Sequence, residues 1–172
     1  MVDGKPAAQG GGPLPAARKK YAELREVIEP LLEKDAEAKI ELTASKKDNE
    51  ISIKANVSNL ARTGDNIRLR FILVEDHVRH AGGNGVRYHH GVARAFPGGA
   101  KGVAMTKKSG EFPATIKLDE VRSKINEYLD ELAKQVPDFT RPPLALKNLR
   151  VVALIQDDDT GDVLQAAQVE IR

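Results

Sequence analysis

Residues 149–171 have the sequence LRVVALIQDDDTGDVLQAAQVEI, the strongest hairpin signal in the chain. Two apolar stretches flank an acidic segment, in which Gly161 can adopt the positive φ that a tight turn needs. The acidic segment also has the oxygen-rich composition of a calcium loop. The calcium reading fits poorly, because the glycine comes fifth rather than sixth and Gln168 stands where an EF-hand has Glu. We therefore expect two antiparallel strands joined by a turn.

Similar strand patterns occur upstream of this hairpin. Residues 40–57 alternate apolar and polar around the polar turn 46–49, and IRLRFILV at 67–74 alternates before it becomes continuously apolar. Further short strands are expected at 86–96, 102–105 and 112–118. About seven short strands with few helices between them favour a mainly β fold, an antiparallel immunoglobulin-like β-sandwich, over residues 36–172.

Two segments have helical instead of alternating spacing. Residues 119–136 carry apolar side chains at helical period, with Asp119 available as the N-terminal cap, and predict a surface helix inserted late in the sandwich. Residues 16–35 predict an N-terminal helix that Pro30 kinks or ends. Residues 1–15 combine glycine, proline and alanine without periodicity, which predicts a flexible arm. This segment lacks the apolar stretch of a signal peptide.

Composition limits the possible chemistry. The chain of 172 residues has no cysteine, which excludes disulfides, cysteinyl metal sites and cysteine nucleophiles. Its apolar runs are far too short to span a membrane. Nine basic and three acidic residues, with all four histidines, fall within residues 61–108. Any functional site is therefore expected in this middle third.

The histidines form the candidate metal site. If residues 71–80 and 86–96 pair as a hairpin, His77 lies opposite His89 and on the same face as Glu75. Two imidazoles and a carboxylate are acceptable ligands for zinc or another divalent cation. The strand register decides whether these three side chains share one face, because a shift by one residue replaces His89 with the neighbouring histidine. Solvent-facing or structurally hydrogen-bonded histidines are the alternative.

Arginines of the same region suggest other roles. Arg79 and Arg87 raise the local positive potential and disfavour a bound cation. Arg94 can point inward and pair with Glu75 or Asp76, which would fix the strand order. An anion- or partner-binding surface is a third possibility, built from Arg68, Arg70, Arg79, Arg87 and Arg94. Binding of nucleic acid is disfavoured because few aromatic rings lie nearby. A phosphate-binding loop is also disfavoured, because the glycine-rich loop 82–85 precedes a strand instead of a helix.

Two stretches resemble the C-terminal immunoglobulin-like domain of bacterial thioredoxin-like secreted or envelope proteins, a group related to the outer-membrane-protein-twenty-eight lipoproteins. They are RFILVEDHVRHAGGNGVRYHHGVARAFPGGAKG at 70–102 and the hairpin at 149–171. The resemblance covers roughly residues 36–172 and implies a periplasmic or cell-envelope location for full-length relatives. It assigns no catalytic residues.

The start of the chain resembles the end of a thioredoxin fold. MVDGK is similar to the strand that follows the thioredoxin cis-proline loop, and the helix at 16–35 stands where the last thioredoxin helix would be. Any Cys-x-x-Cys motif is absent, so redox activity is not implied. A thioredoxin-fold remnant, an excised C-terminal piece and a free-standing domain all fit these residues.

The leading hypothesis is a non-enzymatic accessory or interaction domain of a thioredoxin-like bacterial protein, with protein partners and no cofactor. Its N-terminal helix offers an apolar stripe for self-association. One alternative is a divalent-metal-binding protein or metal-dependent enzyme that uses Glu75, His77 and His89. The other is an anion-binding surface on the arginine-rich strands.

Overall fold

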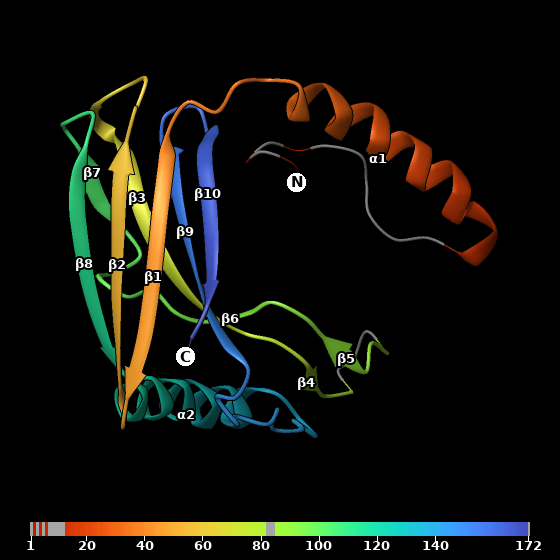
Figure 1. Cartoon of the computed structure of the whole chain (residues 1–172). Coiled ribbons are helices and arrows are strands. Elements are labelled where there is room, and N and C mark those ends of the chain that lie inside the picture. The colour runs from red at the N-terminus through yellow and green to blue at the C-terminus, as the bar shows by residue number, and fades with distance from the viewer. Residues whose placement is uncertain (1, 3, 5, 7–12, 82–84, 172) are drawn as a thin grey trace.

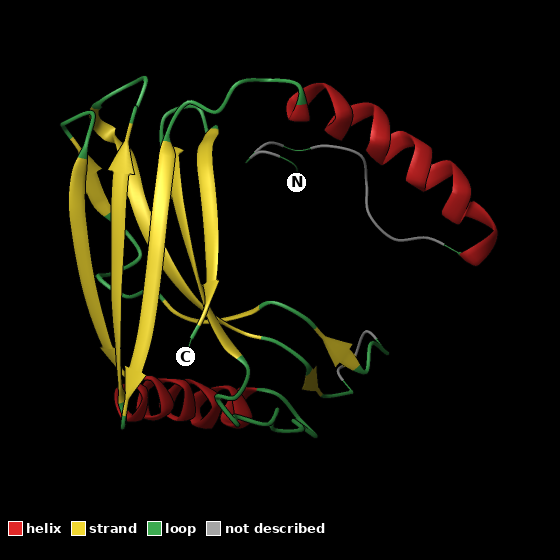
Figure 2. Cartoon of the chain, viewed as in Figure 1, coloured by secondary structure: helices red, strands yellow, loops and turns green. Residues whose placement is uncertain are grey.

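The computed structural model describes residues 2, 4, 6, 13–81 and 85–171 (Figure 1). Two antiparallel β-sheets enclose one apolar core, and a helix crosses one end of the sheets. Figure 2 shows that strands make up most of the body, with a second helix standing apart from it. The prediction of a mainly β, antiparallel fold is therefore confirmed.

The two sheets have different strand orders. The first sheet has the order β1-β2-β8 and consists of β1 (Lys39–Lys47), β2 (Glu50–Ser58) and β8 (Gly110–Lys117). The second has the order β10-β9-β3-β6, with β7 also pairing with β3. Its strands are β3 (Gly64–Glu75), β6 (Val92–Ala95), β7 (Val103–Met105), β9 (Leu149–Asp157) and β10 (Val163–Glu170). Every pairing is antiparallel, and the predicted hairpins β1-β2 and β9-β10 are both present.

The core forms because apolar residues alternate with polar ones along the central strands. The buried series are Ile51, Ile53, Ala55 and Val57 on β2, Ile67, Leu69, Phe71 and Leu73 on β3, and Val151, Ala153 and Ile155 on β9. A side chain of this size stabilises the fold by about 1.5–3 kcal/mol when it is fully buried. The three series belong to one cluster, so the sheets share a single core.

Helix α2 (Leu118–Gln135) crosses the end of the sheets (Figure 1), and its buried Leu118 and Val121 belong to the shared core. The prediction that Asp119 caps it was wrong. The cap residue is Lys117, which is extended and makes no side-chain cap hydrogen bond. Strand β8 runs directly into the helix, and the Leu118 N–H instead donates to a backbone oxygen of the β1-β2 turn at 2.8 Å. Asp119 lies in the first turn, where its charge favours the helix dipole.

Helix α1 (Ala17–Leu32) follows the 3₁₀ turn η1 (Leu14–Ala16) and lies apart from the sheets (Figure 1). None of its residues is buried. Pro30 lies in the last turn, and the helix ends two residues later, which agrees with the expected helix-ending role. The predicted arm 1–15 falls largely outside the described residues. No helix in the described ranges is long and apolar enough to cross a bilayer.

A short ribbon, the β4–β5 arm, extends away from the sheets between β3 and β6 (Figure 1). We define this arm as residues 76–81 and 85–91, with strands β4 (Val78–Arg79) and β5 (Tyr88–His89). The predicted continuous strand at 86–96 is therefore two strands. Residues 82–84 of the predicted glycine-rich connection lie outside the described part of the chain.

The predicted register of the arm was wrong by one residue. His89 pairs with Val78 instead of His77. The reason is that the ladder is interrupted at the base of the arm, where His77 has a φ of 60° and Gly91 a φ of 67°. The Asp76 carboxylate accepts the Gly91 N–H there at 2.8 Å, which closes the base of the arm.

Candidate functional site

An ion pair between Glu75 and Arg94 lies inside the protein, where the two side chains are 4% and 8% exposed. Arg94 Nε and Nη2 each lie 2.7 Å from Glu75 Oε2. The other carboxylate oxygen accepts the Lys147 backbone N–H at 2.8 Å, and Arg94 Nη2 also donates to the Pro143 carbonyl at 3.2 Å. The predicted pairing of Arg94 with Glu75 is confirmed. It ties β3, β6 and the segment before β9 together.

The structure does not bring the three predicted metal ligands together. The Glu75 carboxylate is occupied by its ion pair. His77 packs edge-on against His90, with 4.9 Å between ring centroids, while His89 Nε2 lies 3.0 Å from the His80 carbonyl oxygen. Within residues 13–81 and 85–171, no group of three or more His, Asp or Glu side chains is arranged to hold a metal. Zinc binding by this set stays a prediction.

The arginines of the predicted anion surface lie in three different places. Arg79 and Arg87 are exposed on the β4–β5 arm. Arg68 and Arg70 on β3 are only 17% and 16% exposed, and Arg70 forms a two-pronged pair with Asp158, with both N–O distances 2.8 Å. The hydrogen bond from Arg70 Nη2, together with the arginine charge, holds the pKa of Asp158 below its usual value. The fifth arginine forms the buried ion pair described above, so the five do not make one surface.

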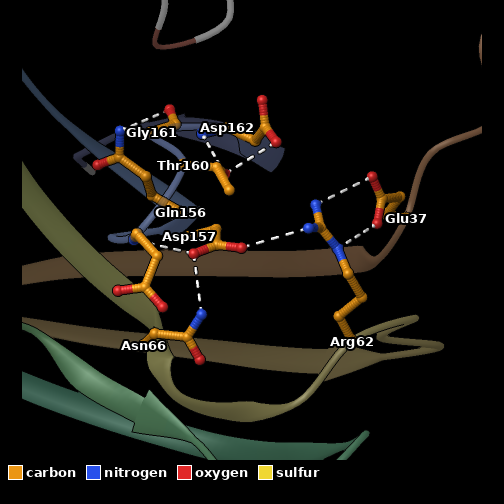
Figure 3. A network of polar contacts seen from close by, with 9 residues as sticks. Glu37, Arg62, Asn66, Gln156, Asp157, Thr160, Gly161 and Asp162 are labelled. Carbon is orange, nitrogen blue, oxygen red and sulfur yellow. Dashed lines mark hydrogen bonds and ion pairs between the residues drawn. The ribbon is translucent and has the colours of Figure 1, made fainter.

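A second buried carboxylate, Asp157, organises the opposite end of the sheets (Figure 3). Its Oδ1 accepts hydrogen bonds from Asn66 Nδ2 at 2.9 Å and from the Asp159 N–H at 3.0 Å. Its Oδ2 accepts one from Arg62 Nη1 at 3.2 Å. Arg62 also donates to both carboxylate oxygens of Glu37, at 2.9 and 3.3 Å. Arg62 therefore links the end of β9 to the segment that precedes β1.

The acidic segment 157–162 forms a hairpin turn, as predicted. The Asp157 N–H donates to the Asp162 carbonyl at 2.9 Å, and the Gly161 N–H donates to the Asp157 carbonyl at 2.8 Å. Gly161 has a φ of 80°, the left-handed backbone expected of it. The carboxylates of Asp157 and Asp158 are held by different arginines, Arg62 in the loop before β3 and Arg70 on β3.

Sequence reasoning missed a pocket of about 680 Å³ at the base of the β4–β5 arm. Its polar lining comes from residues far apart in the sequence, namely Lys46, Asp76, His77, Lys147, Asn148, Arg150 and Glu170. Three non-glycine residues with positive φ, His77, Leu146 and Asn148, contribute to its wall. Asn148 and His77 are of types that are enriched in this backbone region, so the sequence held two weak signals.

No family model matches this chain, and no curated protein matches it. A similar solved structure is the crystal structure of a domain of the outer membrane lipoprotein Omp28 from Porphyromonas gingivalis. The TM-score is 0.50 and the sequence identity 19%, over 80% of this chain and 97% of that chain. The two share a fold. At the level of fold, this likeness supports the resemblance to the outer-membrane-protein-twenty-eight lipoproteins.

Proposed function

We propose that this chain is a non-catalytic interaction domain of the cell envelope that binds an acidic protein surface through the β4–β5 arm. The observation that carries the proposal is a ribbon that leaves the sheets (Figure 1) and exposes aromatic and basic side chains. Tyr88 is 60% exposed on this arm, and the neighbouring Arg79 and Arg87 are exposed too. Tyr and Arg, together with Trp, are enriched among the residues that dominate the binding energy of protein interfaces.

The buried carboxylates support binding over chemistry. A general base needs a carboxylate within reach of the proton that it removes. Glu75 and Asp157, the buried carboxylates of the described residues, are each held by an arginine and by a backbone N–H. Both therefore act as structural ties between segments of the fold.

Charge favours an acidic partner. The arm carries Arg79, Arg87 and four histidines, whereas its acidic residue, Asp76, is already bound to Arg150 and to a backbone N–H at the base. Complementary charge steers association and discriminates among partners, and its effect weakens as salt screens it. We therefore expect binding to be tighter at low ionic strength.

The shared fold with the Omp28 domain, together with the motifs at 70–102 and 149–171, supports three finer parts of the proposal. These are an envelope location, an immunoglobulin-like class of sandwich, and attachment to a thioredoxin-like protein. Deletion of residues 36–172 from a full-length relative should impair partner binding or localisation and leave its thiol chemistry unchanged. Loss of thiol chemistry on this deletion would contradict the accessory role.

Site-specific photocrosslinking tests the arm directly. Three tyrosines have nearly equal exposure in different places, with Tyr88 at 60% on the arm, Tyr128 at 64% on α2 and Tyr21 at 64% on α1. A photoreactive phenylalanine analogue at Tyr88 should give discrete, salt-sensitive crosslinks to envelope proteins in expressing cells. The same analogue at Tyr128 should not. Equal crosslinking from both positions, or hydrolase turnover by the purified chain, would overturn the proposal.

A further inference from the structure

The pocket at the base of the β4–β5 arm has the size and lining of a small-ligand site. Its volume of about 680 Å³ lies within the range typical of such sites. Its walls come from the end of β1, the turn after β3, the segment 146–150 and the end of β10. We propose that it binds a carboxylate carried on a short apolar chain. This site is separate from the arm surface around Tyr88.

The charges that line the pocket favour an anion. Three cationic side chains, Lys46, Lys147 and Arg150, face two carboxylates, Asp76 and Glu170. Asp76 Oδ1 already accepts a hydrogen bond from Arg150 at 3.2 Å and a second from a backbone N–H at 2.8 Å. The charge of Asp76 is therefore compensated within the protein. The two lysines leave the balance of the pocket positive.

Arg150 has hydrogen-bonding capacity to spare. A guanidinium has five N–H donors in a planar fork that suits carboxylates. The described residues supply one acceptor side chain to Arg150, and its buried Nε has none among them. The Arg150 side chain is 30% exposed, and an incoming carboxylate would pair with the N–H donors on its exposed part.

The apolar part of the pocket selects for a carbon chain beside the carboxylate. Leu146, Leu149 and Ile171 contribute to the wall, and Leu146 is only 6% exposed. Ligand sites characteristically combine apolar walls with a few convergent polar groups. An inorganic anion would use the charges and leave the apolar wall unfilled. A carboxylic acid with a few methylene groups, or a peptide C-terminus with an apolar last residue, would use both.

The pocket wall is also held in an unusual backbone conformation. His77, Leu146 and Asn148 have φ values of 60°, 51° and 48°, a region that is uncommon for non-glycine residues and rare for leucine. Such conformations gather at ligand-binding sites and persist only where surrounding contacts enforce them. Here the Lys147 N–H is fixed by the buried Glu75 carboxylate at 2.8 Å. The wall is thus built before any ligand arrives.

Calorimetric titration of the full chain tests the proposal with matched acid and amide probes. The first pair is hexanoate and hexanamide, and the second is N-acetyl-alanyl-leucine with a free or an amidated C-terminus. Each acid should bind at least about tenfold more tightly than its amide, because the amide loses the charge-assisted hydrogen bonds. Binding of both acids indicates a site for any carboxylate on a short apolar chain. Binding of the peptide acid alone indicates a site for a peptide C-terminus.

Variants locate the binding and separate it from folding defects. Lys147→Met should weaken acid binding by about tenfold while it keeps the backbone N–H that Glu75 binds. Lys124→Met on the exposed face of α2 is the matched control and should have no effect. Tyr88→Ala should also leave acid binding unchanged, which distinguishes a failure here from a failure of the arm proposal. Equal affinity for acid and amide, no binding of either acid, or insensitivity to Lys147→Met would overturn the inference.

Discussion

Replacement of Arg94 by methionine should unfold the protein more readily than almost any other change to a polar side chain. The substitution keeps much of the apolar volume but leaves the Glu75 carboxylate, 4% exposed, with one backbone N–H as its partner. Removal of one member of a buried ion pair typically costs about 3–5 kcal/mol, because the remaining charge is uncompensated. We expect the free energy of unfolding to fall by about 4 kcal/mol at neutral pH.

Urea unfolding followed by circular dichroism measures this loss. With a denaturant slope of about 2 kcal/mol per molar, the midpoint should fall by roughly 2 M. The double variant Glu75→Leu, Arg94→Met should lose less than Arg94→Met alone, because apolar replacement of both partners removes the uncompensated charge. Some loss should remain, since the Lys147 N–H and the Pro143 carbonyl each lose a hydrogen-bond partner.

An exposed ion pair of similar length provides the control. Lys54 Nζ lies 3.0 Å from Glu111 Oε2, but these side chains are 48% and 57% exposed. Glu111→Gln should therefore cost no more than about 0.5 kcal/mol. A loss below about 1 kcal/mol for Arg94→Met, or a loss equal to that of the control, would refute the view that burial makes this pair a structural tie.

Three further changes test other parts of the structure. Gly102→Ala should lower the free energy of unfolding by about 2 kcal/mol or more, because Gly102 has a φ of 68° and its new Cβ would lie 2.4 Å from a β3 carbonyl oxygen. Gly98→Ala is the control, since Gly98 has a φ of 81° and its new Cβ would meet no atom within 4 Å. It should cost only about 1 kcal/mol by the same denaturation assay. Asp158→Asn should remove a small stabilisation that is present above pH 3.8 and is lost as the pH falls through the lowered pKa of Asp158, so wild type and variant should converge in acid melts. Zinc added to metal-free protein should change its melting temperature no more than it changes that of His77→Ala, since the three predicted ligands do not converge.

The fold was largely predictable because its strands carry period-two patterns that few other structures accommodate. The alternation through Ile51 and Ile53 on β2 placed that strand and the direction of its buried face. The turn at 158–162 was predictable from Gly161, whose positive φ suits no other residue as well. Patterns of this kind act over a few neighbouring residues, so a sequence displays them directly.

The candidate pocket was not predictable, because its parts meet only through tertiary packing. Lys46 lies near the end of β1 and Arg150 near the start of β9, and nothing in either local sequence indicates that they line one cavity. The arm register failed for a related reason. The positive φ of His77 breaks the strand there, and the enrichment of histidine in that backbone is too weak a signal to locate the break.

The two buried carboxylates explain how one strand register is chosen. The β3-β9 ladder runs from the Ile67–Asp157 pair to the Glu75–Leu149 pair, so one carboxylate closes each end of it. Each also continues the core-facing alternation of its own strand. A slip by one residue is excluded because it turns apolar side chains outward, but a slip by two keeps the apolar pattern intact. That second slip would carry Asp157 away from Arg62 and Glu75 away from the Lys147 N–H, at a cost of about 3–5 kcal/mol for the Asp157 charge left without its arginine. The Glu75–Arg94 pair joins β3 to β6 and fixes the register of that pairing in the same way. The apolar series therefore selects the face of each strand, and the carboxylates select its position along the ladder.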